Sequence, residues 1–204
     1  MRVNKKKFIY LISPNKIYKK FFNDLKKVLE TGKISFFQLR LKKYSFKHKI
    51  LIGQKIKNIC KKNKVKFLIN DDPILAKRLG ADGCHLGQKD MNIKEARKII
   101  GKKIIGITCH NSITLAKIAI KAKASYLAFG AFYSSKTKKT KYAANIKILN
   151  KIKKITKTPI VDIGGINSKN YKKLLLNNAN FLAISGYIWN NKKYKPLEAI
   201  ERLK

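Results

Sequence analysis

Eight short apolar runs, separated by longer amphipathic stretches, limit most strongly what this chain can fold into. Each run is apolar and partly β-branched or aromatic, which is typical of a buried strand. The runs lie at residues 8–12, 36–41, 66–70, 83–86, 103–109, 126–132, 159–163 and 181–185. The stretches between them have helical spacing: Phe21, Leu25 and Val28, for example, fall on one helical face. The chain therefore alternates predicted strands with predicted helices.

The length of this repeat predicts a closed barrel. Dividing 204 residues among eight units gives about 25 residues for each strand and its helix. Strands that alternate with helices pair in parallel, and eight such units predict an α/β fold, the (β/α)8 or TIM barrel. We expect a single compact domain over residues 1–204, with short loops. A doubly wound open sheet is the alternative, but no Gly-x-Gly-x-x-Gly turn follows the first run.

The charge is extreme but evenly spread. The chain has 49 basic and 10 acidic residues, a net charge of +39, and only five of the basic residues are arginine. Nucleic-acid surfaces typically combine arginine, aromatic side chains and clustering, whereas these lysines occupy polar helix positions from end to end. We expect no specific nucleic-acid partner, although the charge should attract small anions.

The termini and the cysteines predict a cytoplasmic chain. No apolar run approaches the ~18–20 residues of a membrane span. Behind the basic cluster Lys5–Lys7, the apolar run is too short for a secretory signal. The three cysteines are an odd number without metal spacing, which is typical of free thiols in a reducing compartment. We expect no membrane partner, and a homo-oligomer is left open.

Polar residues gather where the predicted strands end, which is where barrels of this kind carry their chemistry. Asp71 and Asp90 follow neighbouring runs, and hard oxygen ligands from separate loops are how Mg²⁺ is usually held. Asp72 suits the N-cap of a helix that begins at Pro73, which leaves Asp71 for the ion. We predict a Mg²⁺ site at Asp71 and Asp90.

Two anion sites are also predicted. Gln38, Arg40 and Lys42 alternate along a run, so on a strand their side chains would share one face suited to an oxyanion. Gly164-Gly165 and Ser185-Gly186 follow the last two runs, where barrels bind phosphate through backbone N–H groups. A zinc site at Cys84-His85 and Cys109-His110 is not expected, since adjacent strand residues point to opposite faces.

Five segments resemble the thiamine phosphate synthase/thiazole tautomerase family. They are FQLRLK at 37–42, LINDDPILAKRLGADGCHLGQKD at 68–90, IIGITCH at 104–110, FGAFYSSKTK at 129–138 and IVDIGGI at 160–166. The resemblance implies a transferase, a synthase of thiamine biosynthesis. It would join 4-amino-2-methyl-5-pyrimidinylmethyl diphosphate to a thiazole phosphate and release pyrophosphate.

The resemblance also implies roles for individual residues. Asp71 and Asp90 would bind Mg²⁺, and Arg40, Lys42 and Lys138 would neutralise the departing diphosphate. The residues implied to bind the pyrimidine diphosphate are Gln38, Leu39, Arg40, Leu41, Lys42, Asn70, Thr108 and Lys138. Those implied to bind the thiazole phosphate are Ser135, Lys136, Thr137, Gly165, Ser185 and Gly186.

The chain departs from the family pattern at several of these positions. Thr108 and Gly186 stand where the family usually has serine, and Ser135 stands where it has threonine. Asp162 lies within a predicted strand where a small apolar residue is expected, and a buried carboxyl there needs a partner or a raised pKa.

Three other functions stay open from the sequence. A thiazole tautomerase of the same family would use His110 as a proton shuttle and would need no diphosphate clamp. A basic barrel that binds nucleic acid without catalysis would lose its ligand as salt rises. An unrelated phosphate-binding isomerase would leave the two aspartates unexplained.

Overall fold

The computed structural model describes residues 7–134 and 142–204, and within them eight parallel strands close into a barrel in sequence order. The strands are β1 (Ile9–Ile12), β2 (Ile34–Leu39), β3 (Lys66–Asn70), β4 (Gly83–Leu86), β5 (Ile104–His110), β6 (Tyr126–Gly130), β7 (Ile160–Ile163) and β8 (Phe181–Ile184). β8 pairs with β1 and closes the ring. The predicted (β/α)8 barrel is confirmed.

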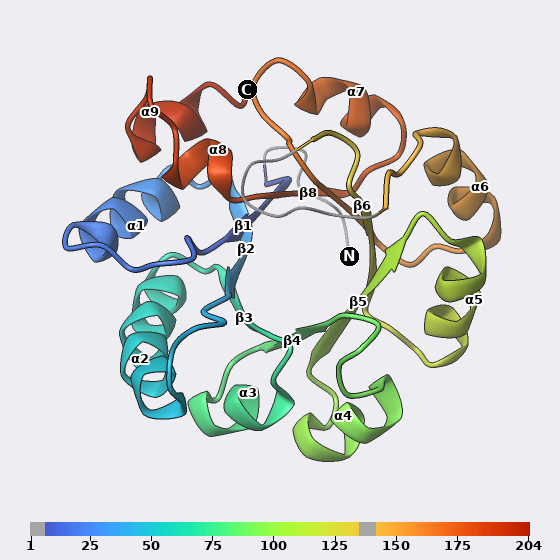
Figure 1. Ribbon diagram of the computed structural model, residues 1–204, viewed down its shortest axis with the longest axis horizontal. Helices are drawn as coiled ribbons and strands as arrows, with labels where there is room; N and C mark the ends of the chain where they lie inside the picture. Colours follow the sequence, from blue (N-terminus) through green and yellow to red (C-terminus); the bar gives the residue numbers. More distant parts are fainter. Residues whose placement is uncertain (1–6, 135–141) are drawn as a thin grey trace.

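Helices surround the strands on the outside, as Figure 1 shows. They are α1 (Phe21–Glu30), α2 (Phe46–Lys62), α3 (Pro73–Leu79), α4 (Ile93–Ile100), α5 (Ile113–Lys121), α6 (Lys147–Ile155), α7 (Tyr171–Leu176), α8 (Gly186–Trp189) and α9 (Pro196–Glu201). None of these helices, within the described ranges, is long and apolar enough to cross a membrane.

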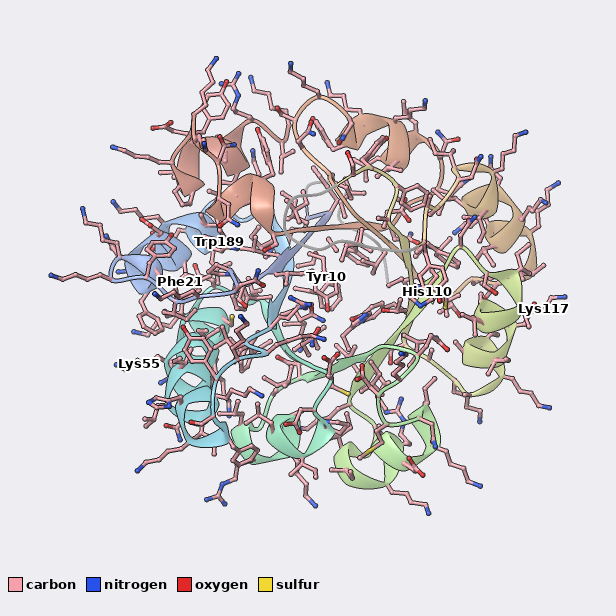
Figure 2. The ribbon with its side chains drawn as sticks, in the orientation of Figure 1. Tyr10, Phe21, Lys55, His110, Lys117 and Trp189 are labelled. Atoms are coloured by element: carbon pink, nitrogen blue, oxygen red, sulfur yellow. The ribbon has the colours of Figure 1, made fainter. Side chains whose placement is uncertain are left out.

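Some of the lysines lie on the outside of this ring of helices. Figure 2 shows Lys55 and Lys117 at its outer edge, on α2 and α5. Basic side chains therefore lie on at least two opposite sides of the molecule.

Strand residues alternate between two apolar layers. Outward-facing residues such as Ile9, Leu11 and Phe67 pack against the helices in the main core. Inward-facing residues such as Tyr10 and Leu68 form a second cluster inside the barrel. Alternation along each strand thus separates the residues that hold the helices from those that can reach the barrel mouth.

Local signals in the sequence explain where several helices begin. Asp72 accepts a hydrogen bond from Leu75 N at 2.8 Å and caps α3, which begins at Pro73. Ser112 caps α5 in the same way. The predicted capping role of Asp72 is confirmed, and the Asp71 carboxyl is left for other contacts.

Candidate active site

Asp71 and Asp90 lie together at the carboxyl ends of β3 and β4. Asp71 has a left-handed backbone, with φ of 63°, and its N–H donates to the His85 carbonyl at 2.8 Å. Its carboxyl contacts that of Asp90, which also accepts from Gly87 N at 2.6 Å. Two acidic side chains that are 19 positions apart in sequence therefore meet at one point.

The electrostatics of this pair favour a cation. Burial raises the pKa of Asp90, contact with Asp71 raises it further, and the Gly87 N–H and Lys42 oppose these effects. Two carboxylates in contact repel each other unless a proton or a cation lies between them. Two hard oxygen donors suit Mg²⁺, which keeps water or phosphate oxygens as its other ligands. The described residues contain no group of three or more His, Cys, Asp and Glu side chains that could hold a metal.

Lys42 reaches the acidic pair. Its Nζ lies 3.3 Å from Asp71 Oδ2, and the lysine side chain is largely exposed. An exposed pair of this kind adds little stability. Its value is positional, because it places an ammonium group beside the two carboxylates.

The prediction that Gln38, Arg40 and Lys42 alternate along one strand is wrong. β2 begins at Ile34 and ends at Leu39, so Arg40 and Lys42 lie beyond it. The reason is Ser13: its N–H donates to the Gln38 carbonyl, and its hydroxyl accepts from Arg40 N at 2.9 Å. The Ser13 side chain takes the place of the next backbone acceptor of the sheet, and the chain leaves the strand after Leu39.

This turn separates the predicted anion ligands. Arg40 Nη1 donates to Asn15 Oδ1 at 3.2 Å, next to β1, whereas Lys42 lies beside β3. Leu39 and Leu41 are buried in the core that packs against the helices. Both leucines also line the cavity described next, and their proposed place beside the pyrimidine diphosphate stays a prediction.

A cavity of about 490 Å³ opens beside Lys42 and Asp71. Lys49 of α2 and Asn70, the last residue of β3, also line it. Gln38 is buried at the end of β2. This part of the mouth thus combines cationic and amide groups next to the acidic pair.

Thr108 lies inside the barrel on β5 and is held from two sides. Its hydroxyl lies 2.9 Å from His85 Nε2, and its backbone carbonyl accepts from Gln88 Nε2. His85 Nδ1 lies 2.9 Å from the Tyr126 hydroxyl, which lies 2.8 Å from that of Tyr10. This chain of contacts was not predicted from the sequence. The signal available was that Tyr10, His85 and Tyr126 each stand among apolar residues of a predicted strand.

On the opposite side of the mouth, glycines form a turn after β7. Gly164 and Gly165 have φ of 109° and 59°. A Cβ on Gly165 would lie 2.3 Å from the Ser134 carbonyl oxygen, so the turn packs closely on the segment after β6. Within the described part of the chain, the Gly165 and Gly186 N–H groups donate to no protein acceptor. Two neighbouring loops therefore offer backbone donors, as a phosphate site requires.

The Ser185 hydroxyl contacts the end of β1, and the expected role of Ser185 at the phosphate site stays a prediction. Its hydroxyl donates to the Ser13 carbonyl at 3.1 Å, which ties the end of β8 to that of β1. Trp189 Nε1 donates to the Ile12 carbonyl at 2.7 Å and strengthens the same connection. Ser185 thus helps to close the barrel. The remaining expected ligands, Ser135, Lys136, Thr137 and Lys138, lie outside the described residues.

The two Cys-His pairs divide between the two faces, as expected. Cys84 and Cys109 are buried free thiols in the outer core, whereas His85 contacts Tyr126 inside the barrel. His110 ends β5 and stacks on Tyr142 with ring centres 3.9 Å apart. Each histidine therefore faces away from the thiol beside it.

Asp162 is fully buried in β7, in register with Phe129 and Leu182 of the outer core. Neither carboxyl oxygen has a hydrogen-bond partner among the described residues. Burial raises its pKa to about 8. The sequence led us to expect either a hydrogen-bond partner for this carboxyl or a raised pKa, and the raised pKa is what the structure gives.

Together these features define a class. The chain is a (β/α)8-barrel protein whose mouth carries an acidic pair with a lysine on one side and a tight glycine turn on the other.

Comparison with known proteins identifies the family within this class. The family model described as thiamine monophosphate synthase matches residues 9–188. The thiamine-phosphate synthase of Pelagibacter ubique is 69% identical over the whole of both chains. That of Erythrobacter litoralis is 39% identical over 94% of this chain and 92% of its own. The chain belongs to the thiamine monophosphate synthase family.

Solved structures agree with this assignment. The thiamine phosphate pyrophosphorylase of Pyrococcus furiosus superimposes with a TM-score of 0.86 at 28% identity, covering 98% of this chain and 94% of that one. The orotidine 5′-phosphate decarboxylase of Pyrococcus horikoshii superimposes at 0.67 but is 13% identical, which shows the shared barrel alone. The family predicted from the sequence is confirmed, and the expected synthase and transferase function agrees with these comparisons.

Proposed function

We propose that this protein is a cytoplasmic, Mg²⁺-dependent thiamine-phosphate synthase that joins 4-amino-2-methyl-5-pyrimidinylmethyl diphosphate to a thiazole phosphate. The observation that carries the proposal is the contact of Asp71 with Asp90 beside Lys42, at the carboxyl ends of neighbouring strands. A diphosphate substrate needs such a combination of metal ligands and cations. The names of the relatives support the same activity.

The reaction we propose begins with departure of pyrophosphate. The bond between the pyrimidine methylene carbon and the diphosphate oxygen breaks, and its electron pair leaves with pyrophosphate. The amino group of the ring donates electrons to the resulting cation. Bound Mg²⁺ would supply positive charge for the leaving group. Lys42 and Arg40 add fixed cationic groups at the mouth, and Lys138 is proposed to act with them.

The second half of the reaction needs positioning more than chemistry. The thiazole nitrogen uses its lone pair to form the new bond to carbon, and no protein nucleophile is required. The N–H groups of Gly165 and Gly186 are proposed to hold the thiazole phosphate on the opposite side of the mouth. Ser135, Lys136 and Thr137 are proposed to complete that site.

Incubation of the purified protein with both substrates and Mg²⁺ tests the proposal. Release of pyrophosphate should match formation of thiamine phosphate one for one, and chelation of the metal should abolish both. Isomerisation of the thiazole phosphate alone, without coupling, would instead identify a tautomerase. A salt-sensitive gel shift without turnover would favour the nucleic-acid alternative.

A further inference from the structure

A chain of hydrogen-bonding side chains runs through the inside of the barrel from Tyr10 to Thr108. Tyr10 and Tyr126 join through their hydroxyls at 2.8 Å, Tyr126 joins His85 Nδ1 at 2.9 Å, and His85 Nε2 joins Thr108 at 2.9 Å. Figure 2 shows Tyr10 pointing into the centre of the ring of strands. The chain links β1, β6, β4 and β5, none of which supplies two members. We call it the interior chain.

The surrounding packing fixes the interior chain in place. A Cβ on Gly106 would lie 1.8 Å from Cζ of Tyr126, so only glycine leaves room for that ring. The Tyr126 ring also stacks on His85 at an angle of 12° and meets Tyr10 edge to face. Both tyrosines are buried. Their hydroxyls are therefore held where they are by ring packing as well as by hydrogen bonds.

Counting donors gives this chain a direction. Among the described residues, the Tyr126 hydroxyl is the one hydrogen-bond partner of the Tyr10 hydroxyl. If Tyr126 donated to Tyr10, the Tyr10 proton would be buried without an acceptor. A buried donor without a partner is destabilising, whereas an unused lone pair on a hydroxyl that is already bonded costs less. This comparison assigns Tyr10 as the donor to Tyr126, a direction that the distance alone leaves open.

The direction then passes along the chain. The Tyr126 hydroxyl, having accepted from Tyr10, donates its own proton to Nδ1 of His85. The neutral imidazole consequently carries its proton on Nε2 and donates it to the Thr108 oxygen. A doubly protonated ring would donate at both nitrogens and again leave one phenolic proton without an acceptor. Burial raises the pKa of both tyrosines, which keeps them donors.

We propose that Tyr126 and Tyr10 are positioning residues that act through His85 to make Thr108 a hydrogen-bond donor toward the substrate. The inference rests on the proposed function and deepens it. With its oxygen occupied by His85, the Thr108 hydroxyl directs its proton into the barrel mouth. It would select an acceptor, which in an aminopyrimidine is an unprotonated ring nitrogen. The reverse direction would make Thr108 an acceptor and select the exocyclic amino group.

The histidine tautomer in the free protein tests this directly. ¹⁵N NMR of histidine-labelled wild-type protein distinguishes the Nε2–H, Nδ1–H and charged forms, and the His85 signals are identified by their loss in His85→Gln. We expect the neutral Nε2–H form. The Nδ1–H form or the charged ring would overturn the proposal. The measurement needs no turnover. Absence of synthase activity would therefore contradict the proposed function, whereas the tautomer of His85 would still test the direction of the interior chain.

A double-mutant cycle tests the link to the substrate. Tyr126→Phe should lower kcat/KM for the pyrimidine diphosphate about 5- to 10-fold, the value of one hydrogen bond. In a Thr108→Val background the same change should have less than about a twofold effect, because the hydroxyl it orients is gone. Additive losses would overturn the proposal.

Tyr171→Phe is the matched control for the cycle. Tyr171 is a buried phenol whose ring stacks on Phe8 and whose hydroxyl contacts the backbone of Lys204, in the outer layer. Its loss should lower stability to a similar extent and leave kcat/KM unchanged. If Tyr126→Phe fails to fold, the His85 tautomer in the wild-type protein still tests the proposal.

Discussion

The two sides of the barrel mouth present different chemical groups, side chains on one side and backbone N–H groups on the other. On the β2–β4 side, charged side chains contact each other: Lys42 with Asp71, and Asp71 with Asp90. On the β7–β8 side, the backbone N–H groups of Gly165 and Gly186 are the donors, and the Ser185 hydroxyl is used to close the barrel. The first side therefore depends on side-chain chemistry, and the second depends on backbone conformation.

The difference explains which departures from the family pattern the chain can accept. A backbone donor is present whatever the side chain, so glycine in place of serine at position 186 keeps the N–H group. A carboxylate ligand has no such substitute. Substitutions that remove a charge should therefore lower activity most on the β2–β4 side. Substitutions that change the backbone conformation should lower it most on the β7–β8 side.

The largest effect is expected at the acidic pair. Asp71→Ala should lower kcat about 100-fold or more, the usual scale for a group that stabilises charge on a leaving group. Steady-state turnover at saturating Mg²⁺ measures this. Asp82→Ala is the matched control, since Asp82 pairs with Lys66 at 3.0 Å at the start of β3, at the other end of that strand. Equal losses in the two variants would show that the Asp71 effect is not local to the site.

A methyl group on the β7–β8 side should have the next largest effect. Gly165→Ala places Cβ 2.3 Å from the Ser134 oxygen at a φ of 59°, so the loop must shift. We expect KM for the thiazole phosphate to rise about 10-fold or more, because a displaced donor loses a charge-assisted hydrogen bond. Gly101→Ala is the control: it has a φ of 60° with nothing within 4 Å, and should change stability alone. A rise in KM for the pyrimidine diphosphate only would contradict the assignment.

Asp162 lies two residues before the glycine turn and should make stability fall as pH rises. Its folded pKa of about 8 lies above the unfolded value of 3.8. Between these values the folded state binds more protons, so each rise in pH lowers the free energy of unfolding. Above about pH 8 the penalty is complete. Asp162→Asn should remove this decline and raise Tm on the alkaline side, as thermal unfolding from pH 5 to pH 9 would measure. If Tm depends on pH in the same way in the wild-type protein and in Asp162→Asn, the raised pKa of Asp162 is contradicted.

The smallest effect is expected where the family pattern is restored. Gly186→Ser adds a hydroxyl at the first residue of α8 without removing the backbone donor. We expect KM for the thiazole phosphate to fall about threefold or less, the contribution of one exposed hydrogen bond, with kcat unchanged. Titration of the thiazole phosphate at fixed pyrimidine diphosphate measures it. A large loss of activity would mean that the β7–β8 side depends on its side chains after all.

The sequence determined the barrel and much of the β2–β4 side. Eight apolar runs at a repeat of about 25 residues leave few ways to bury every run, and parallel closure is one that short helical connections allow. Asp71 and Asp90 could be placed together because each follows a strand, and strands that are neighbours in sequence are neighbours in this fold. Asp72 could be recognised as a helix cap from Pro73 alone.

Only the tertiary structure decided how groups that are distant in sequence use one another. The end of β2 is set by the Ser13 hydroxyl, which lies 27 positions away from the Arg40 N–H it accepts. The Tyr10 and Tyr126 hydroxyls, 116 positions apart, meet inside the barrel through ring packing that Gly106 permits. Strand periodicity reports which face a residue occupies, but a hydrogen bond depends on distance and angle across the closed barrel. Those quantities exist only once the ring has closed.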